Sequence, residues 1–309
     1  MIPYLDRQNL GLSNSDYLRT LYKWKIIDAF YVALVFVASA LVHLSAPYQR
    51  QFTINDLTIS HPFAEHERVP PQMLLELVAV VPLVIFLVVD LILTPSKRKV
   101  YLLYISFLGL AISVTTCDLI VGILKNWVGR CRPDFLARCI PKADALPDTL
   151  YFAKDVCTTT DMGRLLDGFR TTPSGHSSMA FSSFGYVTFW LLGQFLGCSC
   201  NYVGAWRFLV SGLPSLFAAY VALSRTQDYR HHFVDVVLGS AIGWLFAWWA
   251  YRRYFPSVFH KYSYVPSLLL DTAEKGPDDY KTHDFYAEED GNDWQHGDIE
   301  NQSEVTPLS

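Results

Sequence analysis

The chain has 309 residues, of which 51% are hydrophobic and 17% are charged, and its formal net charge at pH 7 is −4. This slightly acidic balance argues against nucleic-acid binding, which relies on a basic surface. The long apolar runs carry almost no charge, and 12 of the 29 acidic residues lie in the C-terminal segment 271–304. Because a soluble protein of this size would spread its charges over its surface, the pattern predicts a polytopic helical membrane protein.

Six apolar runs are each long enough to cross a bilayer, which takes about 20 residues as a helix. In chain order they cover residues 26–46, 73–93, 100–124, 176–197, 205–223 and 233–255. They predict an all-α fold with a core of six transmembrane helices in residues 26–255. Residues 1–25 would precede this core, and residues 256–309 would form an acidic tail without the composition to bury a core of its own. The first run is too long for a signal-peptide core and should act as its own insertion signal.

The distribution of Lys and Arg predicts the orientation of these spans. Basic residues precede the first run, crowd the turn between the second and third, and follow the sixth. The positive-inside rule therefore places these segments and both termini in the cytosol. The opposite side holds residues 47–72, 125–175 and 224–232. The last two of these loops are also basic, which departs from the rule and which a phosphate-binding site would explain.

Residues 61–71, in the first extracytosolic loop, contain His61, Glu65, His66 and Glu67. Their spacing matches no common metal-ligand pattern, and the prolines of the segment break any helix that would align them. We therefore expect a solvated loop, in a position to cover the site, and no metal.

The third span ends in a basic segment that runs to Pro133. Lys125 and Arg132 are two helical turns apart and so can point to a common side, with Pro133 ending the helix. The alternative is anchoring among lipid head groups, which suits Trp127 well. Asp118, deeper in the span, could bond within the bundle or orient a basic residue of the site.

The loop 134–172 contains Cys139 and Cys157, and Cys131 lies just before it. Three cysteines on an oxidising side leave one unpaired. Cys139–Cys157 is the pairing we favour, with Cys131 free, although the sequence alone does not determine the connectivity.

The fourth span opens with Pro173-Ser174-Gly175-His176. Ordinary helix capping accounts for proline and serine at this position. The same backbone N–H groups of Ser174 and Gly175, together with the helix dipole, would also bind an anion. Beside a bound phosphate, His176 would be stabilised as an imidazolium and could protonate a leaving oxygen.

The last extracytosolic segment, Ser224 to Asp235, contains Arg225 and His231. If the helix extends to His231, then His231 and Asp235 are four residues apart and share one face. A carboxylate there would accept the proton of one imidazole nitrogen and leave the other as a nucleophile. Arg225 is suited to phosphate oxygens. A structural function, in which the pair pins the loop to the helix, is the alternative.

These three segments are predicted to meet on one side of the membrane. Together they bring two imidazoles and three cations to the N-terminus of a helix. Cations that neutralise the equatorial oxygens, an in-line nucleophile and an acid for the leaving group are what phosphomonoester or pyrophosphate cleavage needs without a metal.

The three segments also resemble a known family. Lys-x6-Arg-Pro, Pro-Ser-Gly-His and Ser-Arg-x5-His-x3-Asp are the signatures of the type 2 phosphatidic acid phosphatase superfamily. Residues 125–133, 173–176 and 224–235 match them in order and without departures. The resemblance covers about residues 20–260. The loop Ile59-Ser60-His61-Pro62-Phe63 resembles the lipid phosphate phosphatase branch, and within it the fungal diacylglycerol pyrophosphate phosphatases.

The resemblance implies a mechanism and a set of roles. His231 would be the nucleophile that forms a phosphohistidine, Asp235 would set its tautomer, and His176 would protonate the leaving oxygen. The residues implied to hold the phosphoryl group are Lys125, Arg132, Ser174, Gly175 and Arg225. Neither a cofactor nor a divalent cation is implied, and vanadate should inhibit.

The implied substrates are diacylglycerol pyrophosphate, phosphatidate and lysophosphatidate, phospholipids that would bind from within the bilayer. Phosphatases for isoprenoid pyrophosphates or sphingoid-base phosphates are the nearest alternative, and a transporter or a catalytically silent lipid-binding relative are others. An extracytosolic or lumenal active site is compatible with the vacuole, the Golgi or the plasma membrane. Neither the organelle nor the oligomeric state follows from the sequence.

Overall fold

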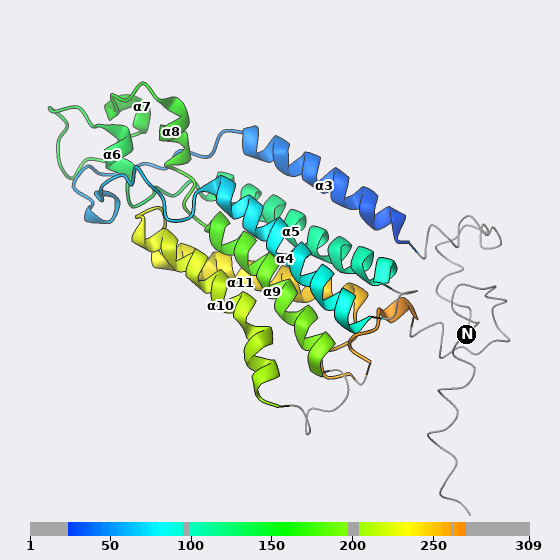
Figure 1. Cartoon of the computed structure of the whole chain (residues 1–309). Coiled ribbons are helices and arrows are strands. Elements are labelled where there is room, and N and C mark those ends of the chain that lie inside the picture. Colours follow the sequence, from blue (N-terminus) through cyan, green and yellow to red (C-terminus); the bar gives the residue numbers. More distant parts are fainter. Residues whose placement is uncertain (1–23, 95–98, 197–203, 261, 270–309) are drawn as a thin grey trace, which may run out of the picture. The chain divides into compact units, whose positions relative to one another are not determined.

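A computed structural model describes residues 24–94, 99–196, 204–260 and 262–269 (Figure 1). Residues 1–23, the cysteines Cys198 and Cys200, and the acidic tail beyond residue 269 lie outside the described residues. The chain divides into two units, Met1–Ser267 and Leu268–Ser309, and the long helices and the candidate site belong to the first.

Six long helices account for most of the described chain. They are α3 (Ile26–Leu44), α4 (Pro71–Leu93), α5 (Lys99–Val128), α9 (Gly175–Leu196), α10 (Trp206–Gln227) and α11 (Phe233–Tyr254). The predicted all-α class is confirmed, since the described residues contain helices and only two isolated β-bridges. Five of the six helices are long and apolar enough to cross a membrane, and α9 is the exception.

Helix α9 lies among the other long helices and packs against α4, α5, α10 and α11. Its core-facing aromatic residues are fully buried, as are several of its serines. These serines bond to neighbouring helices: Ser183 donates to the carbonyl of Val78 at 2.8 Å, and the carbonyl of Ser182 accepts from Ser113 at 2.8 Å. A helix shielded from lipid can carry polar groups that its neighbours satisfy, which explains its lower hydropathy. The six-span count stays a prediction.

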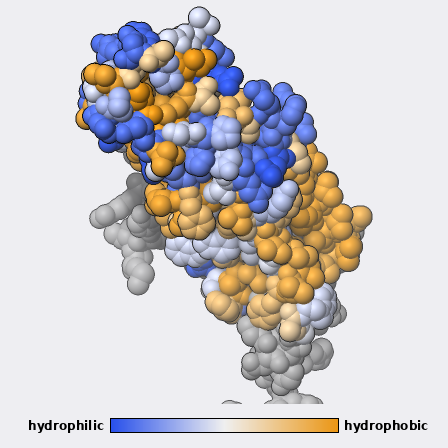
Figure 2. Space-filling model, turned by 90° about the vertical axis from the view of Figure 1, so that its left-hand side faces the viewer, coloured by the Kyte–Doolittle hydropathy of each residue, from blue (hydrophilic) through white to orange (hydrophobic). Residues whose placement is uncertain are grey.

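The outward faces of the other helices are strongly apolar. Large hydrophobic side chains are exposed along α3, α4, α10 and α11. Figure 2 shows hydrophobic residues gathered along the flank of the helical part and hydrophilic residues at one end. A continuous apolar surface of this extent marks contact with lipid, so the protein is a multi-pass integral membrane protein.

A polar cap covers the end of the bundle at which α5 ends and α9 begins. It contains three short helices, α6 (Phe135–Cys139), α7 (Ala153–Val156) and α8 (Met162–Asp167). The preceding loop between α3 and α4 joins it through a β-bridge between Phe52 and Tyr151. The cap has its own hydrophobic core, in which the buried rings of Phe52, Phe135 and Phe169 pack together.

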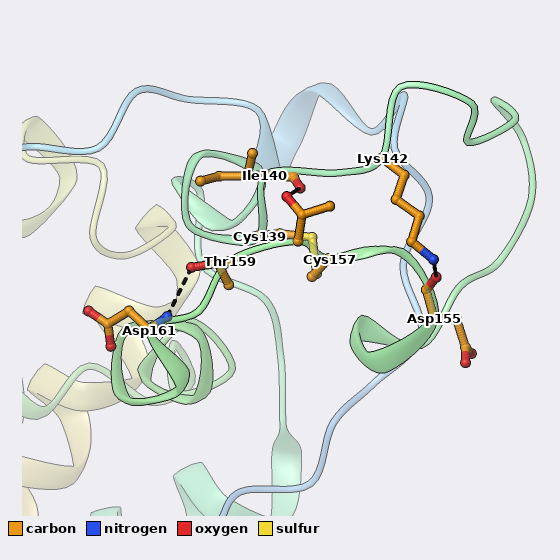
Figure 3. Close-up of a disulfide and its surroundings, with 8 residues drawn as sticks. Cys139, Ile140, Lys142, Asp155, Cys157, Thr159 and Asp161 are labelled. Carbon is orange, nitrogen blue, oxygen red and sulfur yellow. Dashed lines mark hydrogen bonds between the residues drawn. A yellow bond between two sulfur atoms is a disulfide. The ribbon is translucent and has the colours of Figure 1, made fainter.

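A disulfide joins Cys139 and Cys157 within this cap (Figure 3). The bond closes a loop 18 residues long, and the carbonyls of Cys139 and Ile140 both accept from the backbone N–H of Thr158 beside it. Cys131 is free and buried. Burial raises the pKa of its thiol to about 12, so that it stays protonated and unreactive at neutral pH.

Two helix ends differ from the sequence-based prediction, and a third decides how His231 and Asp235 are related. Helix α5 stops at Val128, before Pro133, because Gly129 adopts a left-handed φ of 57° that ends the helix. Helix α10 continues to Gln227, so Ser224 and Arg225 lie on its last turn and not in a loop. Helix α11 begins at Phe233, where the sixth apolar run begins, so His231 lies outside it and the condition for sharing a helix face with Asp235 is not met.

Helices α9 and α11 approach each other closely at two glycines of α11. A Cβ atom on Gly239 would lie 2.4 Å from the carbonyl oxygen of Ser174, and one on Gly243 would lie 2.3 Å from that of Ser178. Glycines four residues apart are typical of closely packed membrane helices. They allow α11 to lie directly against the backbone at the start of α9.

We therefore expect Gly243→Ala to destabilise the bundle by about 1–3 kcal/mol, because the added methyl group has no space between backbone atoms. The apparent Tm of the detergent-solubilised protein should fall, measured by tryptophan fluorescence. Gly212→Ala in α10 is the matched control, since a Cβ there meets nothing within 4 Å. An equal Tm for both variants would contradict the close packing.

Candidate active site

The three predicted segments meet beneath the cap, where α5 and α10 end and where α9 and α11 begin. The charges of Lys125, Arg132 and Arg225 all act on the buried ring of His231, and so does His176. The sequence-predicted residues are thus brought together, although they come from segments about 50 residues apart along the chain.

The ring of His231 is held by a backbone carbonyl. Its Nδ1 lies 2.7 Å from the carbonyl oxygen of Thr171, the residue two before the Pro-Ser-Gly-His segment. Because a carbonyl can only accept, Nδ1 carries the proton, and Nε2 keeps its lone pair. His231 is 3% exposed, so this tautomer is fixed in a buried site.

Asp235 acts on His231 only through Thr171. Its carboxylate accepts hydrogen bonds from the hydroxyls of Thr171 at 2.7 Å and Thr172 at 2.5 Å, and from the backbone N–H of His232 at 3.0 Å. The Thr171 hydroxyl in turn lies 3.3 Å from Nδ1 of His231. The direct His231–Asp235 bond implied by the resemblance is absent from the described contacts. The reason is that α11 starts after His231, and Asp235 caps its first turn.

Burial and three nearby cations determine the protonation of His231. Desolvation, followed by the charges of Arg132, Lys125 and Arg225, lowers its pKa well below the usual 6.5. The ring is therefore neutral at pH 7, which is the state a nucleophile needs.

Lys125 reaches the first residue of α9. A Cβ on Gly175 would lie only 2.7 Å from Nζ of Lys125, so glycine leaves room for the ammonium group beside the helix N-terminus. The backbone N–H of Ser174, by contrast, donates to the carbonyl of Asp235 at 2.9 Å. It is not free for an anion, contrary to the sequence-based expectation, and Ser174 instead ties α9 to α11.

Arg132 is oriented by a carboxylate of α8. Its Nε donates to the carbonyl of Asp167 at 2.9 Å, and its NH2 donates to the side chain at 2.8 Å. Arg138 binds the other carboxylate oxygen at 2.9 Å. Burial lowers the pKa of Arg132 to about 10, and Asp167 opposes this, so the guanidinium stays charged at neutral pH. Burial would raise the pKa of Asp167, but the adjacent guanidiniums hold it far below its usual value.

His176 and Arg225 share one acceptor, the carbonyl oxygen of Val69. Nε2 of His176 and NH1 of Arg225 each lie 3.1 Å from this atom. The Val69 side chain is 1% exposed in the core between α4, α9 and α10, so its carbonyl is firmly placed. Nε2 of His176 therefore carries a proton, and Nδ1 is the nitrogen left to exchange one with a ligand.

Several residues of the site were missed by the sequence analysis. Thr171 and Val69 contribute backbone carbonyls, for which no residue type is diagnostic. Asp167 orients Arg132, and Glu67 lies 3.0 Å from NH2 of Arg225. The two carboxylates could have been sought in the sequence, because buried cations are usually paired. Identifying which carboxylates pair with which arginines requires the three-dimensional structure.

A bundle of apolar helices whose polar end brings two oriented histidines together with several cations defines a membrane-embedded phosphoryl-transfer enzyme. The comparisons with known proteins agree with this class. The profile of the PAP2 superfamily matches residues 106–258. The chain belongs to the PAP2 superfamily.

Three relatives each match more than three quarters of the chain. Diacylglycerol pyrophosphate phosphatase 1 of Saccharomyces cerevisiae is 46% identical over 87% of this chain and 92% of its own length. A probable diacylglycerol pyrophosphate phosphatase 1 of Schizosaccharomyces pombe is 37% identical over 77% of this chain and 84% of its own. Lipid phosphate phosphatase 2 of Arabidopsis thaliana is 30% identical over 77% and 79%. No solved structure matches the chain.

The contact between Gly175 and Lys125 yields a test of the site. In Gly175→Ala the new methyl group would displace the flexible end of Lys125 and would not disturb the helix, because the nearest atom is Nζ. We expect phosphatase activity to fall by about a hundredfold, as for the loss of one oxyanion donor, with an unchanged Tm. Gly163→Ala in α8, where the nearest atom to a Cβ is 3.5 Å away, is the control. Full activity in Gly175→Ala would remove Lys125 from the site.

Proposed function

We propose that this protein is an integral-membrane lipid phosphatase that hydrolyses diacylglycerol pyrophosphate to phosphatidate, and phosphatidate or lysophosphatidate to the dephosphorylated lipid. The main support is His231, whose neutral Nε2 lies among cations at the polar end of a membrane bundle. The names of the two fungal relatives support the pyrophosphate substrate.

In the first proposed step, Nε2 of His231 attacks the terminal phosphorus and forms a P–N bond while the P–O bond to the leaving group breaks. Lys125, Arg132 and Arg225, with the N–H of Gly175, neutralise the oxygens of the transferred group. Protonated His176 gives its Nδ1 proton to the leaving oxygen. Ser174 contributes by fixing the start of α9.

In the second proposed step, water attacks the phosphohistidine, and neutral His176 accepts the proton of the water. The P–N bond breaks, His231 regains its lone pair and inorganic phosphate leaves. The Arg and Lys side chains supply the charge neutralisation that a divalent cation provides in other phosphatases, and the proposal therefore includes no metal.

The position of the site supports a lipid substrate. The proposed catalytic groups lie at the ends of apolar helices. Trp127, near the end of α5, is 74% exposed, as expected of an aromatic belt at the membrane interface. A lipid phosphate at this depth could enter sideways between helices. We infer that this end is extracytosolic or lumenal, with both termini cytosolic, in agreement with the charge pattern and with the disulfide of the cap. The same chemistry would serve an isoprenoid pyrophosphate or a sphingoid-base phosphate, and those lipids belong in the same assay.

The first test is phosphate release from diacylglycerol pyrophosphate and phosphatidate in detergent micelles with EDTA. Wild type should be active, and His231→Ala should lose at least about a thousandfold, because the nucleophile is gone. His260→Ala, an exposed histidine far from the motifs, is the matched control. Activity that survives in His231→Ala would refute the nucleophile assignment, and an inactive, folded wild type would refute the substrates.

The pH profile tests the electrostatics of the site. Protonation of His231 removes the attacking lone pair, and its lowered pKa delays this loss to well below pH 6.5. In Arg132→Gln one of the cations responsible is removed, so the pKa of His231 should rise and the acid limb of kcat/KM should move to higher pH. Ionisation of the substrate phosphate is common to both proteins, so the difference between their midpoints reports the enzyme. An unmoved limb, or one moved to lower pH, would contradict the proposed effect.

A further inference from the structure

The carboxylate of Glu67 lies between two buried guanidinium groups. Its Oε2 is 3.0 Å from NH2 of Arg225, without accepting an aligned hydrogen bond, and its Oε1 accepts a short hydrogen bond from NH2 of Arg230. Glu67 comes from the loop before α4, whereas both arginines flank the last extracytosolic turn. An acidic side chain thus occupies a position at which two guanidinium forks meet.

The other carboxylates near these arginines are already engaged. Asp134 accepts two bonds of 2.9 Å from Arg138 and a longer one, of 3.3 Å, from NH1 of Arg230. Asp228 is bonded by Arg68 at 2.6 and 2.9 Å and lies 3.7 Å from Arg225.

Glu67 is therefore the main counter-charge of both arginines. In addition, Nε of Arg225 and Nε of Arg230 are buried without an acceptor in the described part of the chain. Only Glu67 contacts both guanidiniums, and Asp134 and Asp228 are shared with Arg138 and Arg68, so positive charge and hydrogen-bond donors remain for an anion with more oxygens and more charge.

The pair of arginines lies beside the group that would protonate the leaving oxygen. Arg225 and His176 donate to the same atom, the carbonyl oxygen of Val69, at 3.1 Å each. Arg225 is therefore next to His176, and Arg230 lies one step further, across the Glu67 carboxylate.

We propose that Arg230, together with the edge of Arg225 that faces Glu67, forms a second phosphate subsite for the non-transferred phosphate of a pyrophosphate lipid. The rest of the Arg225 guanidinium stays with the transferred group, and Glu67 occupies the subsite in the free enzyme. The proposal rests on the proposed function and concerns its substrate class. When Nε2 of His231 attacks the terminal phosphorus, the bridging P–O bond breaks and its electron pair stays on the leaving phosphate. The two guanidiniums stabilise that charge. A monophosphate lipid places no phosphate there.

Displacement of Glu67 needs only the rotation of one side chain. The backbone on its C-terminal side is fixed, because the N–H of Arg68 donates to Asp228 and the carbonyl of Val69 is held as described above. The residues on its N-terminal side, Glu65 and His66, are exposed, so solvent is near. Arg230 itself is kept in place by the ring of Phe63, whose centroid is 4.4 Å from its guanidinium carbon.

The test compares kcat/KM for diacylglycerol pyrophosphate with that for phosphatidate at equal surface fractions in micelles. In Arg230→Gln the ratio of the two values should fall at least about tenfold, since only the pyrophosphate uses Arg230. In Glu67→Gln the side-chain shape is kept and the competing charge is lost, so KM for the pyrophosphate lipid should fall. Glu65→Gln, exposed in the same loop, is the control and should change neither value.

An equal loss for both lipids in Arg230→Gln would overturn the subsite and assign Arg230 to the cap alone. A raised KM in Glu67→Gln would show that Glu67 positions Arg225 and does not stand in for phosphate. Arg230→Lys keeps the charge and covers the case in which Arg230→Gln does not fold. Its ratio of the two kcat/KM values should lie between that of wild type and the tenfold lower ratio expected for Arg230→Gln.

A binding measurement separates this proposal from the proposed function. Inorganic pyrophosphate should raise the Tm of the solubilised wild-type protein more than orthophosphate does, and Arg230→Gln should remove the difference. If wild type hydrolyses neither lipid but this pattern holds, the subsite stands and the lipid substrates are wrong. If the two anions raise the Tm equally, the subsite is wrong whatever the activity.

Discussion

The whole site depends on the close contact between α9 and α11. Gly239 and Gly243 let α11 lie against the backbone of α9, and the N–H of Ser174 donates to the carbonyl of Asp235 across this contact. The start of α9, which carries Gly175 and His176, is thereby set in register with the start of α11, which follows His231. A larger residue at either glycine would move both histidines relative to each other, because each is attached to one of the two helix ends.

Electrostatics sets a second condition, since the cations of the site repel one another when no phosphate is bound. The fold offsets this with carboxylates from elsewhere in the chain: Asp167 on Arg132, and Glu67 on Arg225 and Arg230. These ion pairs fix the guanidinium planes before a ligand arrives, which reduces the reorganisation needed on binding. The carboxylates leave a net positive charge at the site, and a dianionic phosphoryl group is the kind of ligand that completes it.

Much of this architecture could be predicted from the sequence, and the predictions that failed did so for clear physical reasons. The helices lie where the apolar runs are, within a few residues, because hydrophobic length is a local property. The end of α5 was misplaced because the left-handed Gly129 stops the helix before Pro133. The bond from His231 to Thr171 could not be foreseen, since a backbone carbonyl has no residue signature. Glu67 was noticed only as one of four possible metal ligands in a loop expected to be solvated, because its pairing with Arg225 spans about half of the chain.

The two histidines share one feature that bears on the proposed chemistry: each is oriented by a backbone carbonyl, His231 by Thr171 and His176 by Val69. A neutral carbonyl stabilises an imidazolium less than a carboxylate would, and the neighbouring cations oppose a positive ring. Burial and these cations therefore keep His231 neutral, which is the state that the proposed attack by Nε2 requires. His176 needs a proton to act as an acid, and a bound phosphate dianion is the group that would favour this proton. The substrate would then help to generate the acid that cleaves it, so that His176 is charged mainly in the complex in which its proton is used.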